Sequence, residues 1–212
     1  MLCNIKTNQT MKNLLKFLIV AIAFISLSFV KNENKVINVV IDSGHGGHDF
    51  GATINELNEK NLITEITKKI KALHTDSEVV FHYTRTDDSF MDLKDRANFI
   101  NQIKPDLAIS LHVNHTKNTD ANGFEIFVSD ENIQYEKSKV FAEKLVEKFS
   151  KTPLRIRGVK KGSFMVLRNS EYPSMVVEIG FISNASDRKY ITSENGQTEI
   201  AQTILDFASD LK

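Results

Sequence analysis

From residue 36 onward, short apolar runs of strand length alternate with segments whose apolar residues recur at helical spacing. VINVVID is one such run, and LITEITKKIKAL is one such helical segment. Strand patterns occur at 36–42, 77–85, 105–113, 123–129, 162–169 and 174–182, and helical patterns occur at 62–73, 92–103, 138–149 and 199–211. This alternation predicts an α/β fold, a single domain with a mostly parallel, twisted sheet of about six strands and helices on both faces.

The first thirty residues differ in character from the rest. A basic start around Lys12 and Lys16 leads into FLIVAIAFISLSFV, which is shorter than the ~20 residues that span a bilayer. We interpret 1–30 as a secretory signal peptide, or alternatively as an uncleaved N-terminal anchor, followed by a polar linker at 31–35. The folded domain is then expected at 36–212 and outside the cytoplasm, in the periplasm, in the cell envelope or secreted.

Charge and cysteine content limit the partners and the cofactors. Lys+Arg and Asp+Glu each number 27, so the formal net charge is zero and no field favours nucleic acid. Cys3 is the single cysteine and precedes the expected domain. That domain can therefore have no disulfide framework and no cysteine-rich zinc site, and a metal would need His and carboxylate ligands.

Titratable residues stand near the ends of three predicted strands. His45 follows the first strand in the loop SGHGG, His112 closes the third, and Glu178 lies in the strand that starts near Ser174. Each of these alone is compatible with a structural role in a loop or a strand. Ligands of parallel sheets bind beyond the carboxyl ends of the strands. The joint occurrence therefore favours a site at this edge.

Glu59 adds a carboxylate from the first predicted helix. It shares a helical face with Leu62 and Ile66, which must pack against the sheet. A carboxylate on a buried face is costly unless it is paired or binds a metal. Glu56, which precedes the helix, and Glu65, which is rotated off the apolar face, are weaker alternatives. Glu59 also fits the start of a helix, where negative charge is favoured.

Two histidines and one carboxylate from separate elements are the donor set of a catalytic zinc site. We predict one Zn²⁺ held by His45, Glu59 and His112. The glycines around the first histidine allow the main chain to approach the metal. We expect Asp42 to orient a histidine or to cap the turn. Glu178, in an apolar strand, is the predicted general base and acid, although a salt-bridged structural role is the alternative.

Five segments together resemble a known family. IDSGHGG, NEKN, SLHVN, VLRN and VVEIGFISN occur in the order seen in zinc-dependent N-acetylmuramoyl-L-alanine amidases of type 3, and the resemblance covers nearly all of 36–212. It implies that the zinc ligands are His45, Glu59 and His112 and that the catalytic residue is Glu178. Ser43 stands where the family usually has proline, a change in the turn that should leave the ligand intact.

The resemblance implies hydrolysis of the amide bond between N-acetylmuramic acid and L-alanine in peptidoglycan. The stem peptide carries carboxylates, so cations should line the groove. Arg168 is the first candidate for substrate contact, together with Asn114 and Glu125. Three further cations could contact substrate or lie in a solvated loop: Arg157, Lys160 and Lys161. Arg85 and Arg96 are expected to tie the surrounding loops together.

The connection after His112 is short. Some members of the resembled family insert a helical plug there, whereas here Gly123 follows within a dozen residues. We therefore expect an enzyme with no built-in plug that needs no protein activator. We also expect a monomer. Two alternatives to the amidase function remain: a zinc peptidase or carboxypeptidase, and a domain that binds peptidoglycan without chemistry. The first usually has a glutamate three residues after its first histidine, and here that position is His48.

Overall fold

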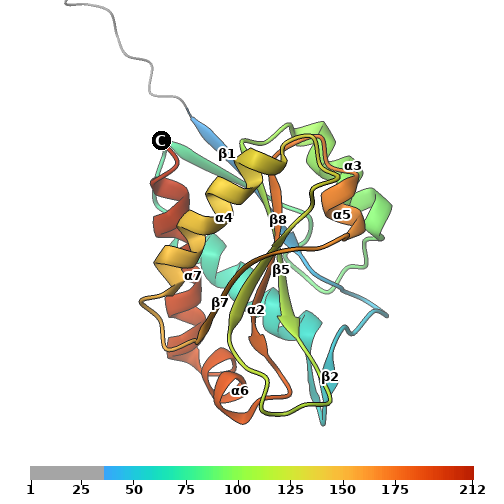
Figure 1. Cartoon of the computed structure of the whole chain (residues 1–212), viewed down its shortest axis with the longest axis vertical. Coiled ribbons are helices and arrows are strands. Elements are labelled where there is room, and N and C mark those ends of the chain that lie inside the picture. Colours follow the sequence, from blue (N-terminus) through green and yellow to red (C-terminus); the bar gives the residue numbers. More distant parts are fainter. Residues whose placement is uncertain (1–35) are drawn as a thin grey trace, which may run out of the picture. The chain divides into compact units, whose positions relative to one another are not determined.

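The computed structural model describes residues 36–212, and a central sheet of six strands organises them (Figure 1). The strands are β1 (Ile37–Ser43), β4 (Val79–Tyr83), β5 (Leu107–Asn114), β6 (Phe124–Val128), β7 (Ile156–Lys161) and β8 (Ser174–Phe181). A separate hairpin pairs β2 (Thr53–Ile54) with β3 (Leu57–Asn58). The signal peptide or anchor predicted at 1–30 and the linker predicted at 31–35 lie outside the described residues.

The sheet has the order β4-β1-β5-β8-β6-β7 and is mostly parallel, as predicted. β1 pairs in parallel with β4 and β5, and β5 pairs in parallel with β8. β6 runs antiparallel to β8, and β7 is parallel to β6. The carboxyl ends of β1, β5 and β8 therefore share one edge of the sheet with the amino-terminal ends of β6 and β7.

Six helices accompany the sheet in the described part of the chain: α2 (Glu59–Leu73), α3 (Leu93–Ile103), α4 (Tyr135–Phe149), α5 (Met165–Arg168), α6 (Ala185–Ile191) and α7 (Glu194–Ser209). Polar side chains cap several of their N-termini. Asn58 accepts a hydrogen bond from the backbone N–H of Asn61 at the start of α2, and Asp92 accepts one from Asp95 at the start of α3. The cap at Asn58 places Glu59 in the first turn of α2.

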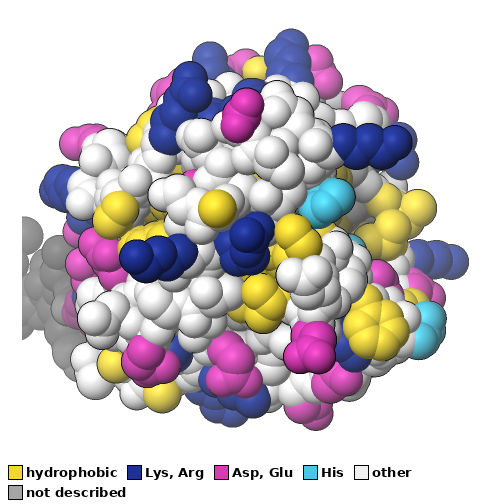
Figure 2. Space-filling model, turned by 90° about the horizontal axis from the view of Figure 1, so that it is seen from below, with side chains coloured by type: hydrophobic (Ala, Val, Ile, Leu, Met, Phe, Trp, Pro, Cys, Tyr) yellow, Lys and Arg dark blue, Asp and Glu magenta, His cyan; other side chains and the backbone are white. Residues whose placement is uncertain are grey.

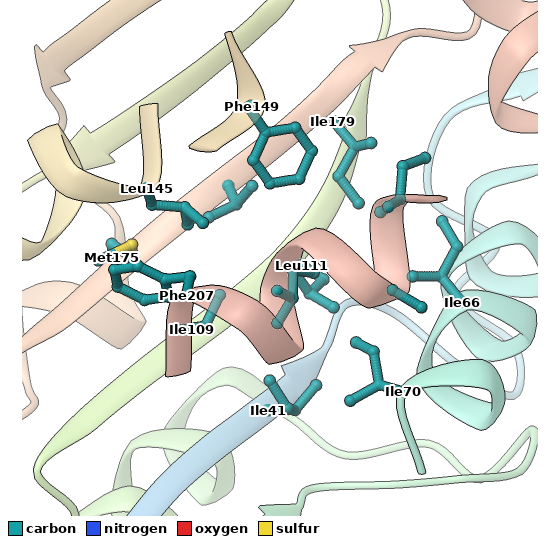
Figure 3. Close-up of a cluster of buried hydrophobic side chains, with 14 of the residues drawn as sticks. Ile41, Ile66, Ile70, Ile109, Leu111, Leu145, Phe149, Met175, Ile179 and Phe207 are labelled. Atoms are coloured by element: carbon teal, nitrogen blue, oxygen red, sulfur yellow. The ribbon is translucent and has the colours of Figure 1, made fainter. Parts of the chain in front are cut away.

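Helices cover both faces of the sheet, which confirms the predicted α/β fold. Successive strand residues point to opposite faces, so Val39 and Ile41 enter one core while Val40 enters the other. The larger core packs α2, α4 and α7 on the sheet, and Figure 3 shows Ile66 and Phe149 converging there with strand residues. The smaller core lies under α3 and α5.

One local prediction differs from the structure, and three elements were not predicted: β7, α6 and the β2–β3 hairpin. The apolar segment 162–169 is not a strand, because it contains the short helix α5, whose Val166 and Leu167 are buried. The sixth strand is β7, which precedes it. β7 pairs only with β6 and is half-buried, so it has no continuous apolar run. The short helix α6 and the β2–β3 hairpin were not predicted, because elements of this length show little periodicity.

Within residues 36–212, no helix is long and apolar enough to cross a membrane.

Candidate metal centre

Three side chains from separate parts of the chain meet at the carboxyl-end edge of the sheet. His45 lies in the loop after β1, Glu59 is the first residue of α2, and His112 lies near the end of β5. One ligand atom from each residue lies within 4.8 Å of the other two. The fold thus brings the predicted ligand set together in a group that can hold a metal ion.

Glu59 links the two histidines. Its Oε2 lies 3.0 Å from His45 Nε2, and its Oε1 lies 2.8 Å from His112 Nδ1. The backbone N–H groups of Ala52 and Val113 donate to the same carboxylate at 2.8 and 3.0 Å. Burial opposes ionisation, but the hydrogen bonds from His112 and His45 hold the pKa of Glu59 well below its usual range. Glu59 is therefore a buried, ionised carboxylate.

The same contacts change the proton affinity of both rings. Burial alone would lower the pKa of His112, but the hydrogen bond and the charge of Glu59 raise it to about 9. Burial likewise opposes protonation of His45, and Glu59 raises its pKa. The other nitrogen of His45, Nδ1, lies 2.8 Å from Asp49 Oδ2, so a carboxylate fixes the orientation of this ring.

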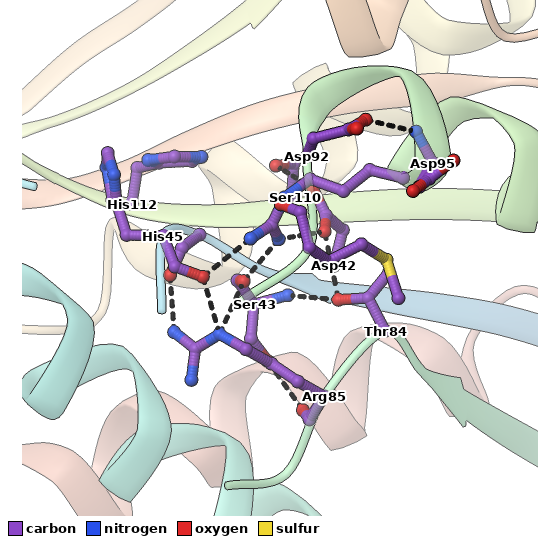
Figure 4. A network of polar contacts seen from close by, with 12 residues as sticks. Asp42, Ser43, His45, Thr84, Arg85, Asp92, Asp95, Ser110 and His112 are labelled. Carbon is purple, nitrogen blue, oxygen red and sulfur yellow. Dashed lines mark hydrogen bonds and ion pairs between the residues drawn. The ribbon is translucent and has the colours of Figure 1, made fainter. Parts of the chain in front are cut away.

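Asp42 does not bond to a histidine, in contrast to one of the roles predicted for it. Its Oδ1 accepts from Arg96 Nη1 at 2.6 Å and from the Thr84 hydroxyl at 2.9 Å, and its Oδ2 accepts from the Ser110 hydroxyl at 2.6 Å (Figure 4). The partner of His45 is Asp49 instead. The sequence reasoning missed Asp49 because it lies in an irregular loop, where spacing says little about which side chains meet.

Two buried arginines hold the loop that carries His45, as expected for Arg85 and Arg96. The carbonyl oxygen of His45 accepts from Arg85 Nε at 2.8 Å and from Arg96 Nη2 at 2.5 Å. Both arginines also donate to the carbonyl of Ser43, and Arg85 donates to that of Gly44 (Figure 4). His45 has φ = 59°, a left-handed conformation that non-glycine residues rarely adopt. The two guanidinium groups stabilise the loop in this conformation.

Glu178 lies beside the group on β8. It is 9% exposed, and its Oε2 has no hydrogen-bond partner among the residues that the structure describes. In the sheet it is in register with His112 on one side and with Glu125 on the other. Burial raises the pKa of Glu178 to about 7, an effect that the nearby His112 partly offsets. This carboxyl group can accept or donate a proton near neutral pH.

Glu125 and Asn114 are joined by a hydrogen bond. Glu125 is 3% exposed, and its Oε1 accepts from Asn114 Nδ2 at 2.9 Å. Its Oε2 accepts from Arg157 Nε and Lys160 Nζ, each at 2.5 Å. Burial opposes ionisation, but these two cations lower the pKa of Glu125. Lys161 is not part of this cluster, because it pairs with Asp130.

A cleft of about 470 Å³ extends from the two histidines between the start of α3 and α5. Much of its wall is apolar: Phe90, Met91, Leu93, Phe164, Met165 and Val166. Figure 2 looks onto this edge and shows histidine (cyan) next to hydrophobic side chains (yellow) and a hollow. Arg168 lies on α5 but is not among the lining residues, and its Nη1 donates to Ser163 Oγ at 3.2 Å.

Comparison with known proteins gives consistent matches. A family model described as N-acetylmuramoyl-L-alanine amidase matches residues 39–209. The N-acetylmuramoyl-L-alanine amidase LytC of Bacillus subtilis strain 168 is 33% identical over 200 residues, which are 92% of this chain and 40% of LytC. The chain spans 40% to 62% of the length of three curated relatives that it matches.

Solved structures show the same fold. The N-acetylmuramoyl-L-alanine amidase of Clostridium difficile 630 has a TM-score of 0.77 and 31% identity, and the match covers 83% of this chain and 96% of that one. The CwlD amidase of Clostridioides difficile, solved in complex with the GerS lipoprotein, has a TM-score of 0.74 and 26% identity over 82% of this chain and 97% of that one.

Proposed function

The chain belongs to the family of type 3 N-acetylmuramoyl-L-alanine amidases, and from this premise we propose that it hydrolyses the amide bond between N-acetylmuramic acid and L-alanine in bacterial peptidoglycan. The observation that carries the proposal is the group of His45, Glu59 and His112 beside the buried carboxyl group of Glu178. A metal centre next to a carboxyl group that titrates near neutral pH is suited to amide hydrolysis.

We assign one Zn²⁺ ion to His45, Glu59 and His112. Two imidazole nitrogens and one carboxylate oxygen are a donor set that catalytic zinc sites use, with a position left for substrate or water. The Oε2 of Glu178 has no hydrogen-bond partner among the described residues. Buried polar atoms are rarely left without a partner, so this supports the presence of a water molecule or a substrate group beside the ligands. Zinc bound there supplies Lewis acidity that polarises the scissile carbonyl and makes water more acidic.

Glu178 is the proposed catalytic residue. As a carboxylate it takes a proton from the attacking water, and as a carboxylic acid it returns that proton to the nitrogen of the leaving L-alanine. Its pKa of about 7 suits both steps, because neither protonation state is rare near neutral pH. Its place in the middle of a buried strand holds the carboxyl group in one position.

Asn114, Glu125 and Arg168 are the proposed substrate-binding residues. Glu125 is itself buried and its oxygens are bonded to neighbours, so its part is to hold Asn114 and the cations of β7 at the rim of the site. Arg168 is exposed on α5 and could reach a longer substrate that extends beyond the cleft.

We propose that the protein is exported, with 1–30 as the signal peptide or anchor, and acts in the periplasm, in the cell envelope or outside the cell. Relatives described as cell-wall amidases support action outside the cytoplasm. We also propose a monomer that needs no activator, although the related CwlD was solved with a lipoprotein partner. Release of stem peptides by the purified protein alone tests whether an activator is needed, and activity that appears only after addition of a second protein contradicts the proposal.

The decisive test is product analysis after digestion of purified peptidoglycan. Mass spectrometry should detect free stem peptides that begin with L-alanine, together with glycan strands that have lost them. Products cleaved within the stem would instead indicate a peptidase, and absence of any product would indicate a binding domain. Chelation of the metal should abolish the products, and added zinc should restore them.

Glu178→Gln provides the matched variant, because it removes the titrating group at almost constant volume. Product formation should fall by about 10²-fold or more, while the zinc content stays that of the wild-type protein. Glu171→Gln, an exposed change on the loop before β8, serves as the control. Full activity in the Glu178 variant would refute the proposed role.

A further inference from the structure

The rim of the site is ordered by charge along the sheet edge. From β1 to β7 it carries His45, His112, Glu178 and Glu125, followed by the cations Arg157 and Lys160. Glu178 thus lies between the histidines and the cations. This order gives the site two chemically different ends.

The end at β6 and β7 has an excess of positive charge. Arg157 and Lys160 share a single buried carboxylate, that of Glu125, so one positive charge in this cluster is not neutralised. Both cations are partly accessible, with side chains 28% and 39% exposed. Lys160 Nζ and Arg157 Nη2 retain N–H groups without a partner among the described residues.

The opposite end is apolar and acidic. Phe90 and Leu93 form the cleft wall there. The lining carboxylates are Asp42, Asp49 and Asp92, and the lining cations are Lys94 and Arg96, of which Arg96 pairs with Asp42. The side chains that line this end of the cleft therefore carry no excess of positive charge, unlike those at the β7 end. A substrate segment rich in carboxylates is therefore disfavoured at this end and favoured at β7.

The orientation that the reaction requires of the bound substrate agrees with this order of charges. Glu178 must reach the leaving nitrogen in order to protonate it, so the leaving peptide begins on the Glu178 side of the scissile bond. The next strands on that side are β6 and β7. We infer that Arg157 and Lys160 select a carboxylate on the leaving stem peptide, an inference that rests on the amidase function proposed above. The leaving peptide then extends from Glu178 over β6 and β7.

Two matched muropeptides test this inference. They differ only in whether the residue after L-alanine carries a free α-carboxylate or a carboxamide. We expect the wild-type protein to favour the carboxylate form by about tenfold in kcat/KM, as for one charge-assisted hydrogen bond at a partly exposed site. The ratio between the two substrates is the useful quantity, because it cancels any change that affects both equally.

Lys160→Met should reduce this preference to about threefold or less, and Lys160→Arg should restore it. Lys161→Met is the control, because the Lys161 side chain pairs with Asp130 and should leave the ratio unchanged. If Lys160 merely neutralises Glu125, the methionine variant will slow both substrates equally, and that result overturns the inference.

The salt dependence of the wild-type preference is a second readout that needs no variant. Raising the ionic strength should narrow the preference, because the cations are solvent-accessible. A preference that is unchanged by salt, or equal cleavage of both muropeptides, overturns the inference and leaves the amidase function intact. Cleavage of neither muropeptide overturns the amidase function, and the inference with it.

Discussion

At the residue scale, the position of His45 depends on Arg85 and Arg96. Both guanidinium groups donate to the carbonyl oxygen of His45, and Arg96 also pairs with the buried carboxylate of Asp42 at 2.6 Å. Arg96 therefore connects the buried carboxylate on β1 to the loop that carries the first proposed ligand. Its planar fork reaches both groups at once, which the single ammonium group of lysine cannot do.

We predict that Arg96→Lys weakens zinc binding by about tenfold, as for other residues that orient metal ligands. It should also lower the free energy of unfolding by about 1–3 kcal/mol, because Asp42 stays buried with poorer hydrogen bonding. A zinc titration against a chromophoric chelator and urea unfolding measure the two effects. Arg155→Lys, an exposed change, is the control. Unchanged zinc affinity in the Arg96 variant would show that the loop keeps its conformation without the guanidinium group.

Zinc binding should also release protons. His112, with a pKa of about 9, is protonated at pH 7 until the metal displaces its proton, and the pKa of His45 is raised as well. Because these pKa values are raised, lowering the pH favours the proton over the metal. We expect release of about one to two protons per zinc at pH 7, and affinity that rises with pH up to about 9.

Calorimetry in buffers of different ionisation enthalpy measures this release. The observed binding enthalpy should change linearly with the enthalpy of the buffer, and the slope gives the number of protons. A binding enthalpy independent of the buffer would contradict the protonated state assigned to His112.

Most residues of the site could be selected from the sequence because a regular element fixed their position, and His45 was selected because its loop directly follows the first strand. His112 and Glu178 lie in apolar strands, and Glu59 lies on the apolar face of a helix, so periodicity placed each at the sheet edge. The contact between His45 and Asp49 depends on the path of an irregular loop with left-handed residues. No repeating pattern encodes that path, so Asp49 was missed and Asp42 was considered for orienting a histidine or capping the turn.

At the scale of elements, the strands and helices with long apolar patterns were predicted best. β1, β5, β8, α2 and α4 bury enough side chains for their period to be visible. β7 lies at the edge of the sheet, and its side chains are half-buried on both faces. Its sequence therefore shows no alternation of apolar and polar residues. The reversed direction of β6 was also invisible, because the apolar pattern of a strand does not depend on its direction.

The packing of α4 gives a prediction at this scale. Phe149 at its end stacks on Phe124 of β6 with ring centroids 4.0 Å apart, and both side chains are fully buried. Phe149→Ala should lower the free energy of unfolding by about 3–5 kcal/mol through loss of burial and a cavity. Val140→Ala on the same helix, where the side chain is 51% exposed, should cost under about 0.5 kcal/mol. Equal losses in urea unfolding of the two variants would contradict this packing.

At the scale of the whole molecule, the candidate metal group joins the loop after β1, the helix α2 and the strand β5. A ligand that binds only the folded state stabilises it by about 2.7 kcal/mol at a hundredfold excess over its Kd. We therefore expect chelation to lower Tm by on the order of 5–10 °C, given the size of the domain. Differential scanning fluorimetry with and without chelator measures the shift.

Glu178→Gln is the informative control for this experiment. Because Glu178 is not one of the three proposed ligands, the variant should lose activity but show the same shift in Tm on chelation. Glu59→Gln should lose most of the shift. A Glu178 variant that no longer responds to the chelator would show that this residue also binds the metal.

The left-handed conformation of His45 has a consequence for laboratory evolution. A non-glycine residue in this conformation costs about 1 kcal/mol relative to glycine. The hydrogen bond between the His45 ring and the buried carboxylate of Glu59 opposes a change to glycine, because glycine would relieve the backbone but leave Glu59 with one partner fewer. Libraries that seek a hardier protein need to hold this codon constant, since the proposed metal ligand at position 45 is also a partner of a buried carboxylate.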